Sequence, residues 1–261
     1  FGMIGCGKNQ VLKKENVNET NQEQATENKE TAEEQQENTN NNTEEQSQSQ
    51  IDYINIAPEE VKIPILMYHS ISDEDPSNNL LVPPAMFEEQ MAWLEANNFT
   101  AMNMDEALEA MRTGKVPKRP VVITFDDGYA NNYTSAFPSL KNHKLKATFF
   151  VITDGVDNGY YMSSDNLKEM QEAGMSIENH TANHLELNNL SKTDAYESIK
   201  RAQDYLRNVI GSDGNYLCYP VGKYNDETIQ IEEELGIKAA VTTQGGFASI
   251  NDGLHTLKRV R

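Results

Sequence analysis

Short apolar segments alternate with amphipathic segments from about residue 61 onward, and this alternation limits the possible folds most strongly. The apolar segments are typical of buried strands, and they are residues 62–68, 120–125, 146–152, 175–178, 216–219 and 237–241. The amphipathic segments predict helices at residues 86–97, 105–112, 163–173, 192–210 and 226–235, and in the C-terminal part of residues 132–143. Strands that alternate with helices form a mainly parallel sheet. The sequence therefore predicts an α/β fold, and the number of strands favours closure into a barrel.

Local signals agree with this arrangement of elements. Gly114 and Gly174 follow predicted helices at positions where helices commonly end, and Ser163 is a typical residue for a helix start. In helix 86–97 the apolar spacing places Trp93 on the buried face. No G-x-G-x-x-G motif follows the first strand, which argues against a dinucleotide-binding sheet.

Two adjacent aspartates, Asp126 and Asp127, come directly after the apolar strand at 120–125. Desolvating one carboxylate costs several kcal/mol unless something compensates its charge, and two neighbouring carboxylates also repel each other. The pair is therefore either solvated in a turn or neutralised by a cation. In barrels of alternating strands and helices the chemistry lies at the C-terminal ends of the strands, which is where these aspartates lie.

Two histidines, His180 and His184, follow the predicted strand at 175–178. Their i, i+4 spacing places both on one face of a helical turn, and paired imidazoles at this spacing are good ligands for zinc and similar cations. Together with one of the two aspartates they would form a site of three protein ligands with a position left for water. The other aspartate would then be placed to act as a general base.

The segments TFDDG (124–128) and HTANH (180–184) resemble the first two motifs of the polysaccharide deacetylase family, also called carbohydrate esterase family 4 or the NodB homology domain. The resemblance covers roughly residues 60–261. It implies a distorted (β/α) barrel of the NodB type, which removes acetyl groups from N-acetylglucosamine polymers. It also implies that Asp126 is the catalytic base. The metal ligands would be Asp127, His180 and His184, and the metal Zn²⁺ or another divalent ion such as Co²⁺ or Ni²⁺.

The third motif of that family usually reads Arg-x-Pro-Tyr-Gly, whereas residues 218–222 read CYPVG. Cys218 thus stands where the family has an arginine that orients the catalytic aspartate. Arg259 or Arg261 would have to substitute for it in space. The backbone N–H of Val221 is expected to contribute to an oxyanion hole, because that role needs only a main-chain donor.

The departing amine needs a proton, which the family usually supplies from a histidine in a late Leu-x-His strand. No such strand is recognised near the end of this sequence, so the deacetylase domain is expected to be C-terminally shortened. His69 ends the first strand in a similar setting, and a closed barrel makes the first and last strands neighbours. This resembles the subgroup that contains biofilm poly-N-acetylglucosamine deacetylases. We expect His69 to be the general acid, with His255 as the rival.

Substrate contacts are expected from Tyr129, Tyr219 and Pro220, which adjoin the motifs. The substrate would be peptidoglycan or poly-N-acetylglucosamine, between which the sequence does not choose. Two other functions remain open. One is a wall-binding lipoprotein that has kept the deacetylase fold without turnover, and the other is a metal-dependent hydrolase of a different amide or ester.

Residues 1–50 differ sharply from the rest of the chain, because they contain ten Glu and four Lys but no Trp, Tyr or Pro. Met-Ile-Gly-Cys at residues 3–6 resembles the end of a bacterial lipoprotein signal. We therefore expect residues 1–6 to be a signal remnant with a lipid on Cys6, residues 7–57 a disordered polar linker, and residues 58–261 the deacetylase domain. This layout predicts a lipid-anchored enzyme outside the bacterial cell membrane.

Composition restricts the partners of the protein. The formal net charge is −19, which argues against nucleic acid and against electrostatic docking on anionic membranes. No apolar run of about 18 residues is present, so a membrane contact would be made only through the N-terminal lipid. We expect a monomer whose partner is an N-acetylglucosamine-containing polysaccharide.

Overall fold

The computed structural model describes residues 51–261. The lipid predicted on Cys6 and the linker predicted up to residue 50 lie outside the described residues. The predicted boundary at residue 58 is wrong, because strand β1 (Tyr53–Asn55) already pairs with β6 (Lys115–Pro117) in an antiparallel ribbon. Within residues 51–261, no helix has both the length and the apolar character that crossing a membrane requires.

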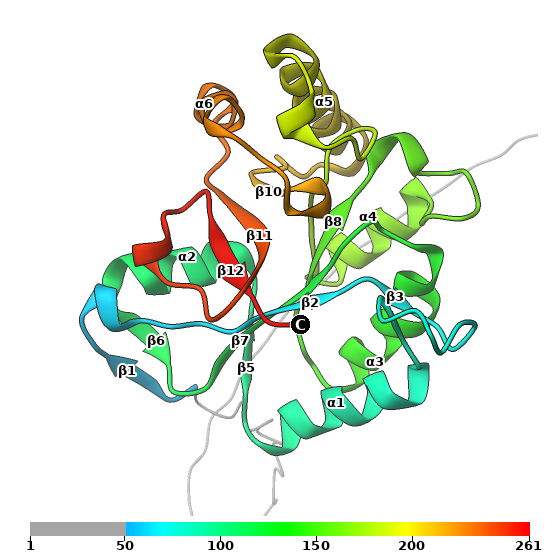
Figure 1. Ribbon diagram of the computed structural model, residues 1–261. Coiled ribbons are helices and arrows are strands. Elements are labelled where there is room, and N and C mark those ends of the chain that lie inside the picture. The colour runs from blue at the N-terminus through cyan, green and yellow to red at the C-terminus, as the bar shows by residue number, and fades with distance from the viewer. Residues whose placement is uncertain (1–50) are drawn as a thin grey trace, which may run out of the picture. The chain divides into compact units, whose positions relative to one another are not determined.

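An eight-stranded parallel sheet forms the centre of the domain (Figure 1). Its hydrogen-bonded order is β12-β11-β10-β9-β8-β7-β2, and β5 pairs with the first half of β7. The strands of this sheet are β2 (Ile65–Tyr68), β5 (Thr100–Met102), β7 (Pro120–Phe125), β8 (Thr148–Val151), β9 (Ser176–Asn179), β10 (Tyr216–Cys218), β11 (Ala239–Gly245) and β12 (Leu257–Arg259). A short parallel ribbon is formed by β3 (Ser70–Ile71) and β4 (Leu81–Val82).

The sheet closes through a single bridge between its two end strands. Leu66 of β2 pairs in parallel with Val260, which follows β12, through backbone hydrogen bonds from Met67 N to Val260 O and from Val260 N to Ile65 O, both 2.8 Å. The predicted barrel is therefore confirmed, and its closure by one bridge makes it a distorted one. The expectation that no strand closes the sequence is wrong, because β12 does so.

Within residues 51–261, six α-helices surround the strands (Figure 1). They are α1 (Pro84–Ala96), α2 (Met104–Thr113), α3 (Phe137–Asn142), α4 (Ser164–Glu172), α5 (Lys192–Tyr205) and α6 (Asp226–Leu235). Ser163 caps α4 as predicted, since its side chain accepts a hydrogen bond from Asn166 N. The helix predicted over 192–210 is α5 followed by a π-helical turn, Leu206–Ile210. Trp93 of α1 is 57% exposed, so its predicted burial is wrong.

Strand β7 shows how the apolar pattern builds two cores. Val121, Ile123 and Phe125 point to one side, into the cluster shared with α1, α3 and α4, whereas Val122 points to the other side among residues such as Ile65. This alternation is the normal period of a strand, and both faces are apolar because helices cover one and the barrel closes over the other. Asp126 and Asp127 thus follow a strand that is fixed on both faces.

His143, at the end of α3, gives the fold a pH-dependent contact. Its Nε2 lies 2.8 Å from Glu88 Oε1 and its Nδ1 lies 2.7 Å from Glu95 Oε2, and both carboxylates belong to α1. The hydrogen bonds to Glu95 and Glu88 raise the pKa of His143 above its ordinary value. Because the folded-state pKa is raised, this contribution to stability is complete below the unfolded pKa of about 6.5 and is lost as pH rises through the folded pKa.

We therefore expect His143→Gln to destabilise the protein by roughly 0.5–1 kcal/mol at pH 5.5 and by much less at pH 9. Thermal unfolding of the variant and the wild type at both pH values measures the difference. An equal loss at the two pH values would show that the side chain acts through packing and not through its charge.

Candidate active site

The predicted site residues meet at one end of the barrel, where the parallel strands finish. Asp126 and Asp127 follow β7, His180 follows β9, and His69 follows β2. Cys218 ends β10, and the guanidinium of Arg259 reaches the same place from β12. The C-terminal strand ends therefore gather four kinds of polar side chain, aspartate, histidine, cysteine and arginine, in one place.

Asp127, His180 and His184 form a compact group of possible metal ligands. Asp127 Oδ1 lies 3.2 Å from His180 Nε2 and 3.4 Å from His184 Nε2. This oxygen is buried and receives no directed hydrogen bond from residues 51–261. A buried carboxylate oxygen that faces two imidazole nitrogens is a donor set that suits a divalent cation such as zinc. The three residues predicted as metal ligands are thus brought together.

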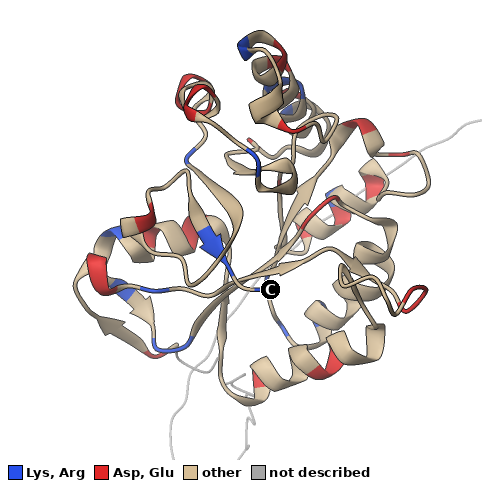
Figure 2. Ribbon diagram, in the orientation of Figure 1, with Lys and Arg blue, Asp and Glu red and all other residues tan. Residues whose placement is uncertain are grey.

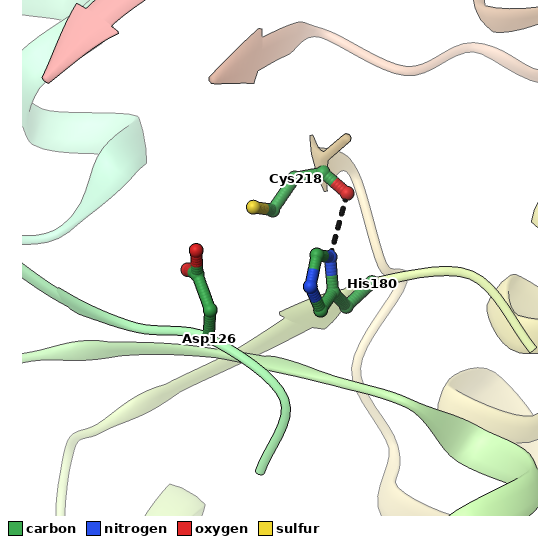
Figure 3. Close-up of side chains that lie close together, drawn as sticks. All are labelled: Asp126, His180 and Cys218. Carbon is green, nitrogen blue, oxygen red and sulfur yellow. Dashed lines mark hydrogen bonds between the residues drawn. The ribbon is translucent and has the colours of Figure 1, made fainter. Parts of the chain in front are cut away.

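A second donor set, Asp126, His180 and Cys218, lies beside the first (Figure 3). His180 belongs to both sets, and a hydrogen bond drawn in Figure 3 decides which of its nitrogens is free to bind a metal. In this bond, His180 Nδ1–H donates to the Cys218 carbonyl oxygen at 2.7 Å. A carbonyl can only accept, so Nε2 is left as the ligating atom, and it faces Asp127. The Asp126 carboxylate and the Cys218 sulfur are both engaged by Arg259. Asp127, His180 and His184 are therefore the better cation site.

The loop 180–184 is not the helical turn that the i, i+4 spacing predicted. Thr181 and His184 have φ values of +65° and +55°, and they let the chain bend so that both imidazoles face Asp127. Asn179 Oδ1 accepts from Thr181 N at 2.8 Å, and Ala182 N donates to Ser198 O of α5 at 3.0 Å. The loop is therefore fixed by its own side chains and by α5.

Left-handed backbone conformations concentrate at this site. Seven residues other than glycine in the described chain have positive φ, and four of them belong to the motifs: Asp127, Thr181, His184 and Val221. Such conformations cost free energy and persist where the surrounding structure enforces them, as at active sites. Val221 is the most unusual of them, because it is β-branched and has φ 48° and ψ 21°.

Arg259 and Asp126 form a buried, bidentate ion pair. Arg259 Nη1 donates to Asp126 Oδ1 and Nη2 donates to Oδ2, both at 2.7 Å. The remaining donors of the guanidinium reach Thr242 O at 2.8 Å, Thr124 Oγ1 at 3.1 Å and Cys218 Sγ at 3.3 Å. Arg259 is only 2% exposed, and it belongs to the basic strand β12 in Figure 2. The structure thus selects Arg259, not Arg261, as the residue that takes the place of the motif arginine.

This ion pair decides the charge of Asp126. Burial alone would raise the pKa of its carboxyl group, but the Arg259 guanidinium outweighs that effect and holds the pKa well below its ordinary value. Asp126 is therefore ionised at any physiological pH. Burial raises the pKa of the Cys218 thiol, with Arg259 acting in the opposite direction.

His69 lies on the other side of Asp126. Its Nε2 is 3.7 Å from Asp126 Oδ2, and its own backbone carbonyl accepts a hydrogen bond from Asn132 Nδ2 at 2.7 Å. Burial lowers the pKa of His69, whereas the Asp126 and Asp127 carboxylates act in the opposite direction. The rival His255 is held elsewhere, with Nδ1 at 2.5 Å from the buried Glu232 Oε2. The geometry therefore favours His69 as the histidine of the site.

The predicted substrate contacts are only partly supported. Tyr129 is partly exposed and lies beside the Asp127 carboxylate; burial and that carboxylate together raise the pKa of Tyr129. Tyr219 is 1% exposed and Pro220 is also buried, so neither lines a groove as predicted. The hydroxyl of Tyr219 instead donates to His255 O at 2.8 Å and supports the loop that carries Val221.

Sequence reasoning missed the pair Asn131 and Asn132, which hold the segment after β2. Asn131 Oδ1 accepts from Ile71 N at 3.0 Å and its Nδ2 donates to Ser70 Oγ at 2.8 Å, while Asn132 binds the His69 carbonyl. The signal was two adjacent amides directly after the aspartate motif, at the start of a π-helical turn. Such turns are frequent at functional sites.

A (β/α) barrel with these residues at its strand ends has the arrangement of a hydrolase with a candidate divalent-cation site. A family model described as polysaccharide deacetylase matches residues 113–240. A Bacillus subtilis protein named as a polysaccharide deacetylase, YxkH, is 40% identical over 201 residues, which is 77% of this chain and 71% of that protein. This protein belongs to the polysaccharide deacetylase family.

Two further relatives extend the comparison. The poly-beta-1,6-N-acetyl-D-glucosamine N-deacetylase of Staphylococcus epidermidis is 30% identical over 69% of this chain and 71% of its own length. The Streptococcus pyogenes deacetylase PplD, solved in complex with acetate, is 36% identical and superposes with a TM-score of 0.75 over 77% of this chain and 92% of that one. The fold and the enzyme class predicted from the sequence are thereby confirmed.

Proposed function

We propose that this protein is a metal-dependent N-deacetylase that acts on the N-acetylglucosamine residues of a cell-wall or exopolysaccharide glycan. The observation that carries the proposal is the buried Asp127 Oδ1, which faces two imidazole nitrogens beside the ion-paired Asp126. The Staphylococcus epidermidis relative, a poly-beta-1,6-N-acetyl-D-glucosamine N-deacetylase, supports poly-N-acetylglucosamine as the substrate. Peptidoglycan is the alternative glycan.

The residues divide the reaction between them. A divalent cation, Zn²⁺ or in its place Co²⁺ or Ni²⁺, held by Asp127, His180 and His184 would polarise the acetyl carbonyl and acidify water. Asp126 is ionised and accepts a proton from the attacking water. The low pKa of His69 makes its imidazolium a ready proton donor to the departing amine. Acetate and a glucosamine residue are the products.

The backbone around Val221 supports its predicted role at the oxyanion. Val221 has a left-handed conformation, and the next residue packs tightly on β11, because a Cβ on Gly222 would lie 2.2 Å from Thr243 Oγ1. A backbone N–H held in a fixed loop can stabilise a developing negative charge without reorganisation. We assign the N–H of Val221 as a hydrogen-bond donor to the oxyanion that forms at the acetyl carbonyl.

We also propose that the enzyme works outside the membrane, tethered through a lipid on Cys6. The composition of residues 7–50 supports this, because a mostly polar segment without Trp, Tyr or Pro suits a spacer between a lipid and the domain. Metabolic labelling of the full chain with a fatty-acid analogue, beside Cys6→Ser, tests the lipid. Equal labelling of both chains would exclude it.

Metal removal tests the proposed function directly. We expect the full chain to release acetate from poly-N-acetylglucosamine oligomers. A chelator should lower the rate at least about tenfold, and added Zn²⁺ should restore it. His184→Ala should fold, but added Zn²⁺ should not restore its rate, because only two of the three metal ligands remain. Peptidoglycan is assayed in parallel to identify the glycan.

Three outcomes would reject the proposal. Release that is insensitive to chelation would remove the metal from the mechanism. A folded, metal-loaded chain that binds both glycans but releases no acetate would be a wall-binding lipoprotein instead, and acetate release from simple amides or esters alone would indicate a different hydrolase.

A further inference from the structure

We propose that Tyr160 and Tyr161, together with Tyr129, form an aromatic subsite that binds a second hexosamine ring of the glycan, next to the ring that is deacetylated. This inference rests on the proposed function and specifies how the same site recognises a polymer.

Three tyrosine rings form a cluster that begins at the candidate cation site. Tyr129 and Tyr161 are stacked, with ring centroids 5.6 Å apart and planes inclined by 23°. Tyr160 stands nearly perpendicular to both, at 5.5 Å and 83° from Tyr129 and at 5.1 Å and 87° from Tyr161. Tyr129 in turn lies against the Asp127 carboxylate. The aromatic surface is therefore continuous with the site at which an acetyl group would be hydrolysed.

The segment that carries Tyr160 and Tyr161 is fixed to the segment after Asp127. Ala130 N donates to Tyr160 O at 3.0 Å, and Tyr129 and Tyr161 form an antiparallel bridge. Asn158 Oδ1 accepts hydrogen bonds from Tyr160 N at 2.9 Å and from Tyr161 N at 3.1 Å. The backbone of both tyrosines is thus positioned before any ligand binds.

Glycine is required behind this cluster. A Cβ on Gly155 would lie 2.5 Å from Cδ2 of Tyr161, so the ring packs directly on the glycine backbone. Tyr161 and Tyr129 are half-buried, whereas Tyr160 is the most exposed of the three rings. The loop is therefore shaped to present one aromatic side chain to solvent.

Tyr160 has the properties of a ligand-binding side chain. It is 65% exposed, although two neighbouring rings fix its orientation. Tyrosine offers a large contact area and loses little conformational entropy on binding, and aromatic side chains commonly line ligand sites. A pyranose ring presents an apolar face of C–H groups that packs well on such a surface. Because the cluster adjoins the reaction site, the neighbouring ring of the same glycan is the occupant that fits.

A series of oligomers of increasing length tests the subsite in the full chain. We expect Tyr160→Ala to lower kcat/KM by roughly 5- to 10-fold on long N-acetylglucosamine oligomers, through KM. Its kcat, and its rate on the shortest substrate that is turned over, should match the wild type, because in this proposal a single ring occupies the deacetylation site and not the aromatic subsite. Tyr160→Phe keeps the ring and should retain most of the affinity.

Trp93→Ala is the matched control, since Trp93 is 57% exposed but lies on α1. An equal loss in that variant, a loss of the same size on the shortest substrate, or a fall in kcat would each overturn the subsite.

Binding gives a readout that does not need turnover. Calorimetry with a hexamer in the Asp126→Asn background should show weaker binding after Tyr160→Ala, and unchanged binding would overturn the proposal even if the wild type is inactive. Acetate release by the wild type tests the proposed function separately.

Discussion

Asp126→Asn is expected to lower acetate release by about 10²- to 10⁴-fold, the range that a general acid or base contributes. The asparagine keeps the shape of the side chain but cannot take a proton from water. In the wild type Asp126 is ionised because Arg259 holds its pKa below the ordinary range. The acid limb of the wild-type pH profile therefore belongs to another group, and the variant should show the lowered rate at every pH. Steady-state rates between pH 5 and 9 measure both effects.

Asp105→Asn is a suitable control for this variant. Asp105 also accepts two side-chain hydrogen bonds, from Tyr216 at 2.6 Å and from Lys238 at 2.8 Å, but none of these residues belongs to the candidate site. It should leave the rate nearly unchanged. A folded, metal-loaded Asp126→Asn chain that keeps more than about a tenth of the wild-type rate would exclude Asp126 as the base.

Arg259→Leu is the second variant with a large expected effect. It leaves the buried Asp126 carboxylate without its partner, which should destabilise the protein by about 3–5 kcal/mol. The pKa of Asp126 should rise, and acetate release should fall by roughly 10- to 100-fold, as is typical when the partner of a site residue is removed. Arg259→Lys should recover little, because an ammonium group cannot form the bidentate pair. Chemical denaturation and rate measurements on the same preparations separate stability from activity.

Cys218→Arg combined with Arg259→Leu distinguishes the charge from the strand that carries it. Cys218 Sγ is 3.3 Å from Arg259 Nη2, so a longer side chain from position 218 can reach the same carboxylate. We expect the double variant to regain part of the activity that Arg259→Leu loses. Recovery of stability without recovery of rate would show that the guanidinium supports the fold only.

Much of the fold could be predicted because its signals are local. Strand β7 and helix α6 have the predicted bounds, since an apolar run and a capped amphipathic segment are each readable within a dozen residues. Strand β12 was missed because it has only three residues, two of them cationic. Its arginine is buried by an ion pair that no apolar pattern can indicate. Trp93 was misplaced because the packing of neighbouring elements decides which part of a helix is covered.

The site divides in the same way. Asp126, Asp127, His180 and His184 lie within two contiguous motifs, so they could be assigned directly from the sequence. The choice between Arg259 and Arg261 could not be made from the sequence, because Arg259 and Asp126 are 133 residues apart and meet only when the barrel closes. The loop conformation at 180–184 was also beyond prediction, since positive φ at Thr181 and His184 depends on the hydrogen bonds that hold that loop.

The origin of the guanidinium has a consequence for how relatives of this protein are classified. A search pattern that requires arginine at the position of Cys218 would place this chain among inactive members, although the Arg259 guanidinium binds the Asp126 carboxylate and lies 3.3 Å from the Cys218 sulfur. Such patterns record where a side chain leaves the backbone, whereas the reaction depends on where its charged end arrives. Sorting these enzymes by which strand delivers the cation would separate true losses of function from exchanges between two strands of one barrel.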